Sequence, residues 1–169
     1  MSAGVPFGRR RVGSALRADR AMKTFRTLRG FLASSEPDED TRFAFSASLR
    51  IFGDIPEVEA VSQRLGLQPT HVHRKGQNRG EGVPPWPHDT WSYTPALAEP
   101  QPLEEHINNL WSALKPHKRY LFDLKKTARV DVFLGYHTNF DHAGIEVPHT
   151  SLEMFRELEI PFGLSIIVA

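Results

Sequence analysis

Three segments of the sequence alternate apolar and polar residues, and this period of two is the strongest constraint on the fold. In residues 43–52 every second side chain is apolar, with small or polar residues between them. Residues 90–94 and 129–137 alternate in the same way. The pattern is typical of a strand with one buried and one solvated face. It predicts a sheet covered by helices on one face only, because a doubly wound sheet needs strands that are apolar on both faces.

Segments with helical periodicity separate these strands. We expect Asp54 to cap the first helix and Gly66 to end it in a left-handed conformation. A second, longer amphipathic helix ends before Pro116, and a third starts at a capping box formed by Thr150 and Glu153. Further short strands are expected at residues 70–73, 145–147 and 162–168. The order predicts an α+β fold with an antiparallel or mixed sheet, helices on one face and two ferredoxin-like βαβ halves.

Charge divides the chain into two parts. The net charge is +1, but residues 1–30 alone hold eight basic residues and one acidic residue, so the remainder carries −6. We expect residues 1–41 to form a flexible basic extension followed by an acidic linker, and residues 42–169 to form a single α+β domain. The extension could instead bind nucleic acid or anionic lipid, serve as a targeting peptide, or precede a true start at Met22.

The composition excludes several classes of protein. The chain has no cysteine, so disulfides, thiolate nucleophiles and cysteine-bound zinc are excluded. No apolar run approaches the roughly 20 residues of a membrane span, and the basic N-terminal segment lacks the roughly 7–15-residue apolar core of a secretory signal, so we do not expect export. We therefore expect a cytoplasmic protein. Because the chain outside the basic extension is acidic, we do not expect nucleic acid to be a partner.

Several short motifs can be read together. They are residues 65–70 (LGLQPT), residues 74–76 (RKG), the pair Trp91-Ser92, and a helix with Leu152 and Leu158 that leads to Phe162. Over about residues 43–168 the chain resembles an uncharacterised bacterial family, the domain of unknown function DUF4279. The resemblance implies a small α+β domain without an established activity. It implies no catalytic residues.

The loop that follows the first motif holds the best candidates for ligand binding: His71, His73, Arg74, Lys75, Trp86, His88 and Trp91. If residues 70–73 form a strand, His71 and His73 share a face, and His88 could be a third metal ligand. The basic residues, with Arg79, could instead bind a phosphate or stack on a base beside the tryptophans. Solvent-exposed histidines on a polar loop are the commoner explanation. A second cluster, His137, Asp141 and His142, is explained by a turn.

The uncovered face of the sheet is a different kind of candidate. Its predicted residues are mostly small, with Phe52, Phe133 and Ile167 among them, and such an apolar patch favours a homodimer or another protein partner.

Two functions are consistent with these features. We favour a non-enzymatic bacterial protein-interaction or regulatory domain, such as a toxin-neutralising immunity protein. The alternative is a metal- or phosphate-ligand-binding module, or an enzyme, that uses the loop from His71 to Trp91. The sequence contains no catalytic or cofactor-binding motif, so no cofactor is expected.

Overall fold

The computed structural model describes residues 42–140 and 144–169. The predicted extension and linker, and Asp141 and His142 of the second cluster, lie outside these residues. The strands are β1 (Phe43–Gly53), β2 (His71–His73), β3 (Asp89–Tyr93), β4 (Ala128–Thr138) and β5 (Leu164–Val168). The α-helices are α2 (Val58–Leu65), α3 (Leu103–Leu114), α4 (Lys118–Leu124) and α5 (Glu153–Leu158), and the short 3-10 helices are η1 (Lys115–His117) and η2 (His149–Leu152). None of the described helices is long and apolar enough to cross a membrane.

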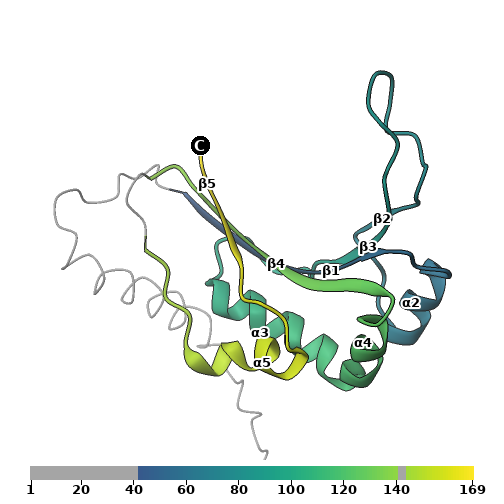
Figure 1. Cartoon of the computed structure of the whole chain (residues 1–169). Coiled ribbons are helices and arrows are strands. Elements are labelled where there is room, and N and C mark those ends of the chain that lie inside the picture. The colour runs from purple at the N-terminus through teal and green to yellow at the C-terminus, as the bar shows by residue number, and fades with distance from the viewer. Residues whose placement is uncertain (1–41, 141–143) are drawn as a thin grey trace, which may run out of the picture. The chain divides into compact units, whose positions relative to one another are not determined.

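The five strands form one mixed sheet in the order β2-β3-β1-β4-β5. All neighbouring strands are antiparallel except β4 and β5, which are parallel. The first four strands have the order of a split βαβ fold, and β5 extends it by one strand. The α-helices cover one face, while the opposite face carries no described helix (Figure 1). The predicted α+β class, mixed sheet and one-sided cover are therefore confirmed.

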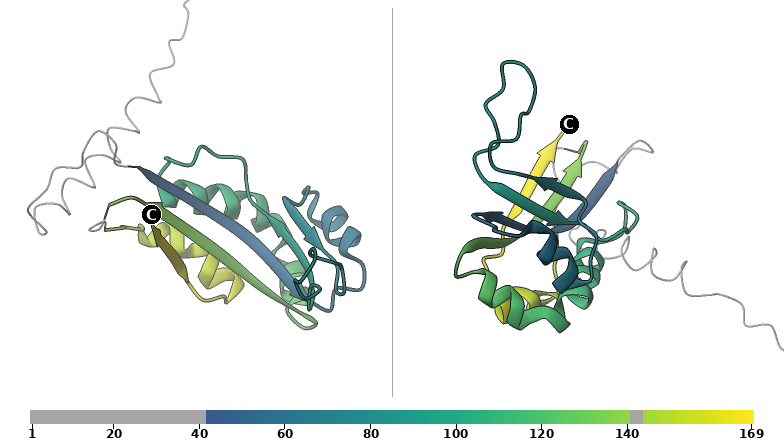
Figure 2. Two further views of the ribbon diagram at one scale, coloured as in Figure 1. Left: turned by 90° about the horizontal axis from the view of Figure 1, so that it is seen from above. Right: turned by 90° about the vertical axis from the view of Figure 1, so that its right-hand side faces the viewer.

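The alternation in sequence corresponds to the two faces of the sheet. In β1 the buried side chains are Phe45, Ala47, Leu49 and Ile51, and those between them are partly exposed. In β4 the apolar set that faces the helices is Val130, Val132, Leu134 and Tyr136. The views in Figure 2 show the helices packed beneath these two long strands. Burial of this apolar face against the helices is the main driving force for the fold.

Helix α2 ends as the sequence predicts, but it begins differently. Gly66 adopts a left-handed conformation with φ of 63°, and its N–H donates to the carbonyl of Ser62. The predicted cap by Asp54 is wrong, because the helix begins at Val58 after Glu57, without a side-chain capping bond. The Asp54 carboxylate lies instead 3.5 Å from the Lys75 ammonium.

Two further local predictions near the C-terminus are wrong. Thr150 does not cap α5, because residues 149–152 form the 3-10 helix η2 and the Glu153 carboxylate accepts a hydrogen bond from Lys115 at 3.0 Å. Residues 144–148 form no strand. Strand β4 pairs instead with β1 on one edge and with β5 on the other.

Trp91 of β3 joins the sheet to α2. Its side chain is fully buried, and its indole N–H donates to the Ser62 hydroxyl at 2.9 Å. A buried indole N–H costs free energy if it is left without an acceptor. This hydrogen bond therefore helps to hold α2 against the sheet.

We expect Ser62→Ala to lower the free energy of unfolding by about 1–2 kcal/mol, because the buried indole N–H loses its acceptor. The measurement is urea-induced unfolding with an unchanged m-value. Ser112→Ala is the matched control, since the Ser112 hydroxyl donates only to the exposed helix carbonyl of Asn108. Equal stability of the two variants would contradict this role for Ser62.

Candidate functional site

An ion pair lies at the centre of the open face of the sheet. Arg50 of β1 and Asp131 of β4 are paired residues in neighbouring strands. The Arg50 guanidinium binds the carboxylate through two bonds, Nε to Oδ1 at 2.8 Å and Nη2 to Oδ2 at 3.0 Å. The Asp131 side chain is only 8% exposed, and Arg129 approaches the same carboxylate at 3.5 Å. Two arginines thus share one carboxylate, so the cluster of Arg50, Arg129 and Asp131 has an excess of positive charge.

The same arginines cover the aromatic residues of the open face. The Arg50 Cζ lies 4.9 Å from the ring centroid of Phe133 and 6.0 Å from that of Phe52, and the Arg129 Cζ lies 5.3 Å from Phe52. Such distances are typical of cation–π contacts. Phe52 and Phe133 are therefore not a bare apolar patch, and Ile167 is separate from them on β5.

The connection between β2 and β3 projects from the sheet (Figure 1). Trp86 is held within it by two backbone hydrogen bonds, from the Gly76 N–H to the Trp86 carbonyl at 2.8 Å and from the Trp86 N–H to the Gln77 carbonyl at 3.1 Å. The ring of His73 stacks on Trp86 at 4.0 Å, with 13° between the planes. The Arg79 Cζ lies 4.2 Å from the Trp86 ring centroid. These contacts fix the position of the Trp86 indole.

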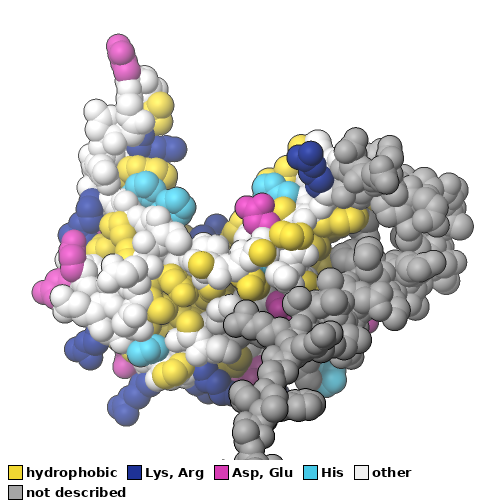
Figure 3. Space-filling model, turned by 180° about the vertical axis from the view of Figure 1, so that it is seen from behind, with side chains coloured by type: hydrophobic (Ala, Val, Ile, Leu, Met, Phe, Trp, Pro, Cys, Tyr) yellow, Lys and Arg dark blue, Asp and Glu magenta, His cyan; other side chains and the backbone are white. Residues whose placement is uncertain are grey.

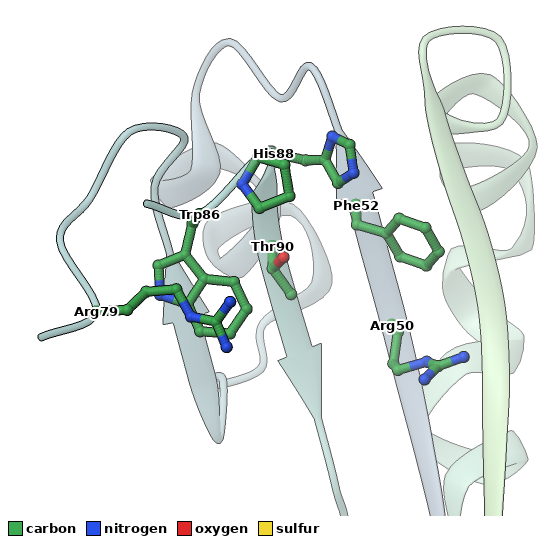
Figure 4. Close-up of a pocket in the computed structure, with 7 residues that line it drawn as sticks. Arg50, Phe52, Arg79, Trp86, His88 and Thr90 are labelled. Carbon is green, nitrogen blue, oxygen red and sulfur yellow. The ribbon is translucent and has the colours of Figure 1, made fainter. Parts of the chain in front are cut away.

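A pocket of about 320 Å³ lies between this loop and the open face. Its lining residues are Arg50, Phe52, Arg79, Trp86, Pro87, His88 and Thr90. Figure 4 shows the Arg79 guanidinium over Trp86 on one side and Arg50 with Phe52 on β1 on the other. In the space-filling view the surface is hollowed beside the projecting loop (Figure 3). The lining includes two guanidinium groups and no carboxylate, so the pocket suits an anionic group.

The structure does not bring the seven ligand-binding candidates together in one site. Trp86 and His88 line the pocket, and His73 supports Trp86 from β2. His71 is exposed on β2 and is not among the lining residues. Trp91 is buried in the core on the helix-covered side, so its indole cannot contact a ligand in this pocket. Among the described residues no three histidine, aspartate or glutamate side chains gather in a way that could hold a metal ion.

Arg74 and Lys75 anchor the loop at its base through Asp89, the first residue of β3. The Asp89 carboxylate accepts two backbone hydrogen bonds, from the Lys75 N–H at 2.9 Å and from the Ile55 N–H at 3.3 Å. The Arg74 guanidinium lies 3.8 Å from the same carboxylate. The Lys75 N–H is the largest cause of a lowered pKa for Asp89; burial opposes it, while Ile55 and the nearby positive charges add to it. The predicted basic residues thus have a structural role here.

Sequence reasoning missed the contribution of β1 and β3 to the pocket. From the sequence, Arg50 is only one of the small or polar residues that alternate with the apolar ones in residues 43–52, Phe52 belongs to a possible partner interface, and Thr90 is the first residue of an alternating segment. The pairing of Phe52 with Thr90 brings them to the same end of the sheet as the loop. The alternation of β1 and β3 shows that the side chains of Phe52 and Thr90 face away from the core. The register between the two strands is needed to place these residues side by side.

We expect Asp89→Asn to destabilise the protein at neutral pH by about 1 kcal/mol, because charged hydrogen bonds at the base of the loop are weakened. The carboxyl pKa is lowered in the folded state from its ordinary value of 3.8. Its contribution is therefore present above about pH 4 and is lost as the pH falls through the folded pKa. Urea unfolding at several pH values checks the expectation that the difference from wild type shrinks in acid.

Asp54→Asn is the matched control for this measurement, since the Asp54 side chain is 83% exposed and has only a 3.5 Å contact with Lys75. We expect it to change stability little at any pH. A difference between wild type and Asp89→Asn that stays constant from neutral to strongly acidic pH would contradict the role of the carboxylate.

Comparison with known proteins identifies a family but supplies no function. No curated protein and no solved structure matches the chain. The model of one family, described as a domain of unknown function (DUF4279), matches residues 43–169. This range includes all five strands and the pocket. The chain therefore belongs to the DUF4279 family.

Proposed function

We propose that the protein is a non-enzymatic interaction domain that binds an acidic segment of another protein in the pocket beside Trp86. A regulatory or immunity-type role fits such a domain, because proteins of this kind act by binding to their partner and need no catalytic site. The observation that carries the proposal is the state of Arg79. Its guanidinium lies over the Trp86 ring, and no ion pair of Arg79 is found within the described part of the chain.

A stacked guanidinium is well prepared to bind a carboxylate. Stacking holds the plane of the group in place, and its N–H donors point outward from the edge. A carboxylate can accept two of these bonds side by side. Arg50 and Arg129, with a single carboxylate between them, add positive charge nearby. Phe52, Pro87 and Trp86 provide apolar contacts for the methylene groups of a glutamate or for a neighbouring side chain.

The backbone of the loop favours a carboxylate over a phosphate. Phosphate sites in glycine-rich loops use free backbone N–H groups that converge on the anion. Here the N–H groups of Gly76, Gln77, Gly80, Val83 and Trp86 all donate to acceptors within the loop itself. These donors are therefore not available to surround a phosphate. The side chains, and above all Arg79, are therefore the main anion-binding groups of the pocket.

The test measures tryptophan fluorescence during titration with a hexaglutamate peptide at low salt. Trp86 is half-buried, whereas Trp91 and Trp111 are buried, so a bound peptide is expected to change the Trp86 signal. We expect saturable binding that weakens with added salt, because a charged pair on an accessible surface is screened. Trp86→Phe should abolish the signal, and hexaglutamine should not bind.

Arg79→Ala should weaken hexaglutamate binding by about tenfold, equivalent to ~1.4 kcal/mol. The matched control is Arg64→Ala, since Arg64 also contacts an aromatic ring, that of Tyr120 at 5.9 Å, but lies on α2. Equal affinity of Arg79→Ala and Arg64→Ala would overturn the proposal. Stronger binding of inorganic phosphate than of hexaglutamate, also lost in Arg79→Ala, would favour the phosphate-ligand alternative.

A further inference from the structure

The two edges of the sheet differ in their protection against pairing with another strand. At one edge, β2 is only three residues long and is followed by Arg74 and Lys75. At the other edge, β5 is five residues long, and residues 162–169 contain no charged side chain. Short strands and nearby charges are the usual means by which proteins prevent edge-to-edge association. Strand β5 has neither.

Exposed apolar side chains concentrate at the β5 edge. Phe162, Ile166, Ile167 and Val168 are 45%, 56%, 44% and 54% exposed, and they are four of the seven large hydrophobic residues found exposed in the described chain. Ile166 and Val168 project to the helix side of the sheet, and Ile167 projects to the open side, since successive side chains alternate. Strand β5 therefore exposes apolar side chains on both faces and carries no charged side chain that would oppose pairing with another strand.

The hydrogen bonds between β4 and β5 show which backbone groups point outward. The Ala169 N–H donates to the Thr138 carbonyl at 3.0 Å, so Ala169 is directed toward β4. In a strand the N–H and C=O groups of alternate residues point to opposite edges. The backbone groups of Leu164, Ile166 and Val168 therefore point away from β4. No strand in residues 42–140 or 144–169 pairs with them, and the view from above in Figure 2 shows β5 at the edge of the sheet beyond β4.

We propose that β5 pairs antiparallel with β5 of a second copy of this chain, so that two five-stranded sheets join into one. With Ile166 at the twofold axis, Leu164 of one protomer lies opposite Val168 of its partner. The residues whose backbone points outward then match an apolar residue with an apolar residue, and no charged side chain of β5 opposes the contact. A second copy satisfies these conditions by symmetry, because an isologous interface requires only a self-complementary strand.

This pairing is independent of the pocket. Strands β1 and β4 separate β5 from β3 and the loop that forms the pocket. The dimer would therefore leave Arg79 and Trp86 of both protomers open to a ligand. Of the three residues of the predicted partner interface, only Ile167 belongs to the strand that forms this dimer. Phe52 and Phe133 remain on the open face beneath Arg50 and Arg129.

The first experiment is sedimentation of the full chain over a wide range of protein concentration. We expect wild type to approach twice its mass of 19.1 kDa as the concentration rises. Ile166→Lys and Val168→Lys should each weaken this association by about tenfold or more, because a lysine at the edge opposes strand pairing. Both side chains are more than half exposed, so the variants should retain the wild-type circular dichroism spectrum.

The matched control is Val72→Lys, which places the same charge on the other edge strand at a residue 39% exposed. We expect it to associate like wild type. A wild-type protein that stays monomeric at every concentration would overturn the proposal, as would equal association of Ile166→Lys and wild type. Because the readout is mass, failure here is distinct from failure of peptide binding at Arg79.

Amide hydrogen exchange tests the location of the contact. At high concentration the outward amides of Ile166 and Val168 should be protected in wild type and exposed in Val168→Lys, whereas Ala169 keeps its bond to β4 in both. A monomer with protected Ile166 and Val168 amides would also overturn the proposal, because another segment of the same chain would then pair with β5. A dimer lost in Phe133→Glu but kept in Ile166→Lys would place the contact on the open face instead.

Discussion

The pairing of β1 with β4 determines most of what lies on either face of this sheet. Each strand is 11 residues long, and their register runs without interruption from Phe43 opposite Thr138 to Gly53 opposite Ala128. A shift of one residue would turn the apolar side chains of one strand from the helices to the open face. The same register places Arg50 beside Asp131. The core and the open face are thus specified by a single alignment of two strands.

The Arg50–Asp131 pair adds specificity to that alignment. A carboxylate that is almost completely buried is costly unless it is paired, and only the observed register brings two arginines to Asp131. Such a pair contributes less to net stability than its short distances suggest, because desolvation of the charges opposes their attraction. Its larger effect is to penalise other registers. It also fixes Arg50 at the edge of the pocket.

Alternation was sufficient to predict the sheet and its one-sided helical cover, because it reflects burial directly, and the order of strands and helices along the chain predicted the two βαβ halves. Features that depend on contacts between distant segments were not predictable in this way. Asp54 has the right spacing for a helix cap, yet Lys75, from a loop that lies close only in the fold, binds it instead. Trp86 and Trp91 were grouped because they are near in sequence. In the structure they lie in different places. Trp91 belongs to β3 and faces the helices, whereas Trp86 precedes this strand and lines the pocket.

The pocket is built from parts that are already held in place before any ligand arrives. Asp89 ties the base of the loop through the backbone of Lys75 and Ile55, and the loop amides bind acceptors within the loop. Trp86 is packed by His73, and Arg79 is stacked on Trp86. Ordering flexible side chains costs free energy on binding, so groups ordered in advance retain more of their interaction energy for the ligand. Because the N–H groups of Gly76, Gln77, Gly80, Val83 and Trp86 are occupied, most of that energy is expected to come from side chains. This favours a carboxylate bound by a guanidinium over a phosphate surrounded by backbone, and it makes Arg79 the residue on which affinity should depend most.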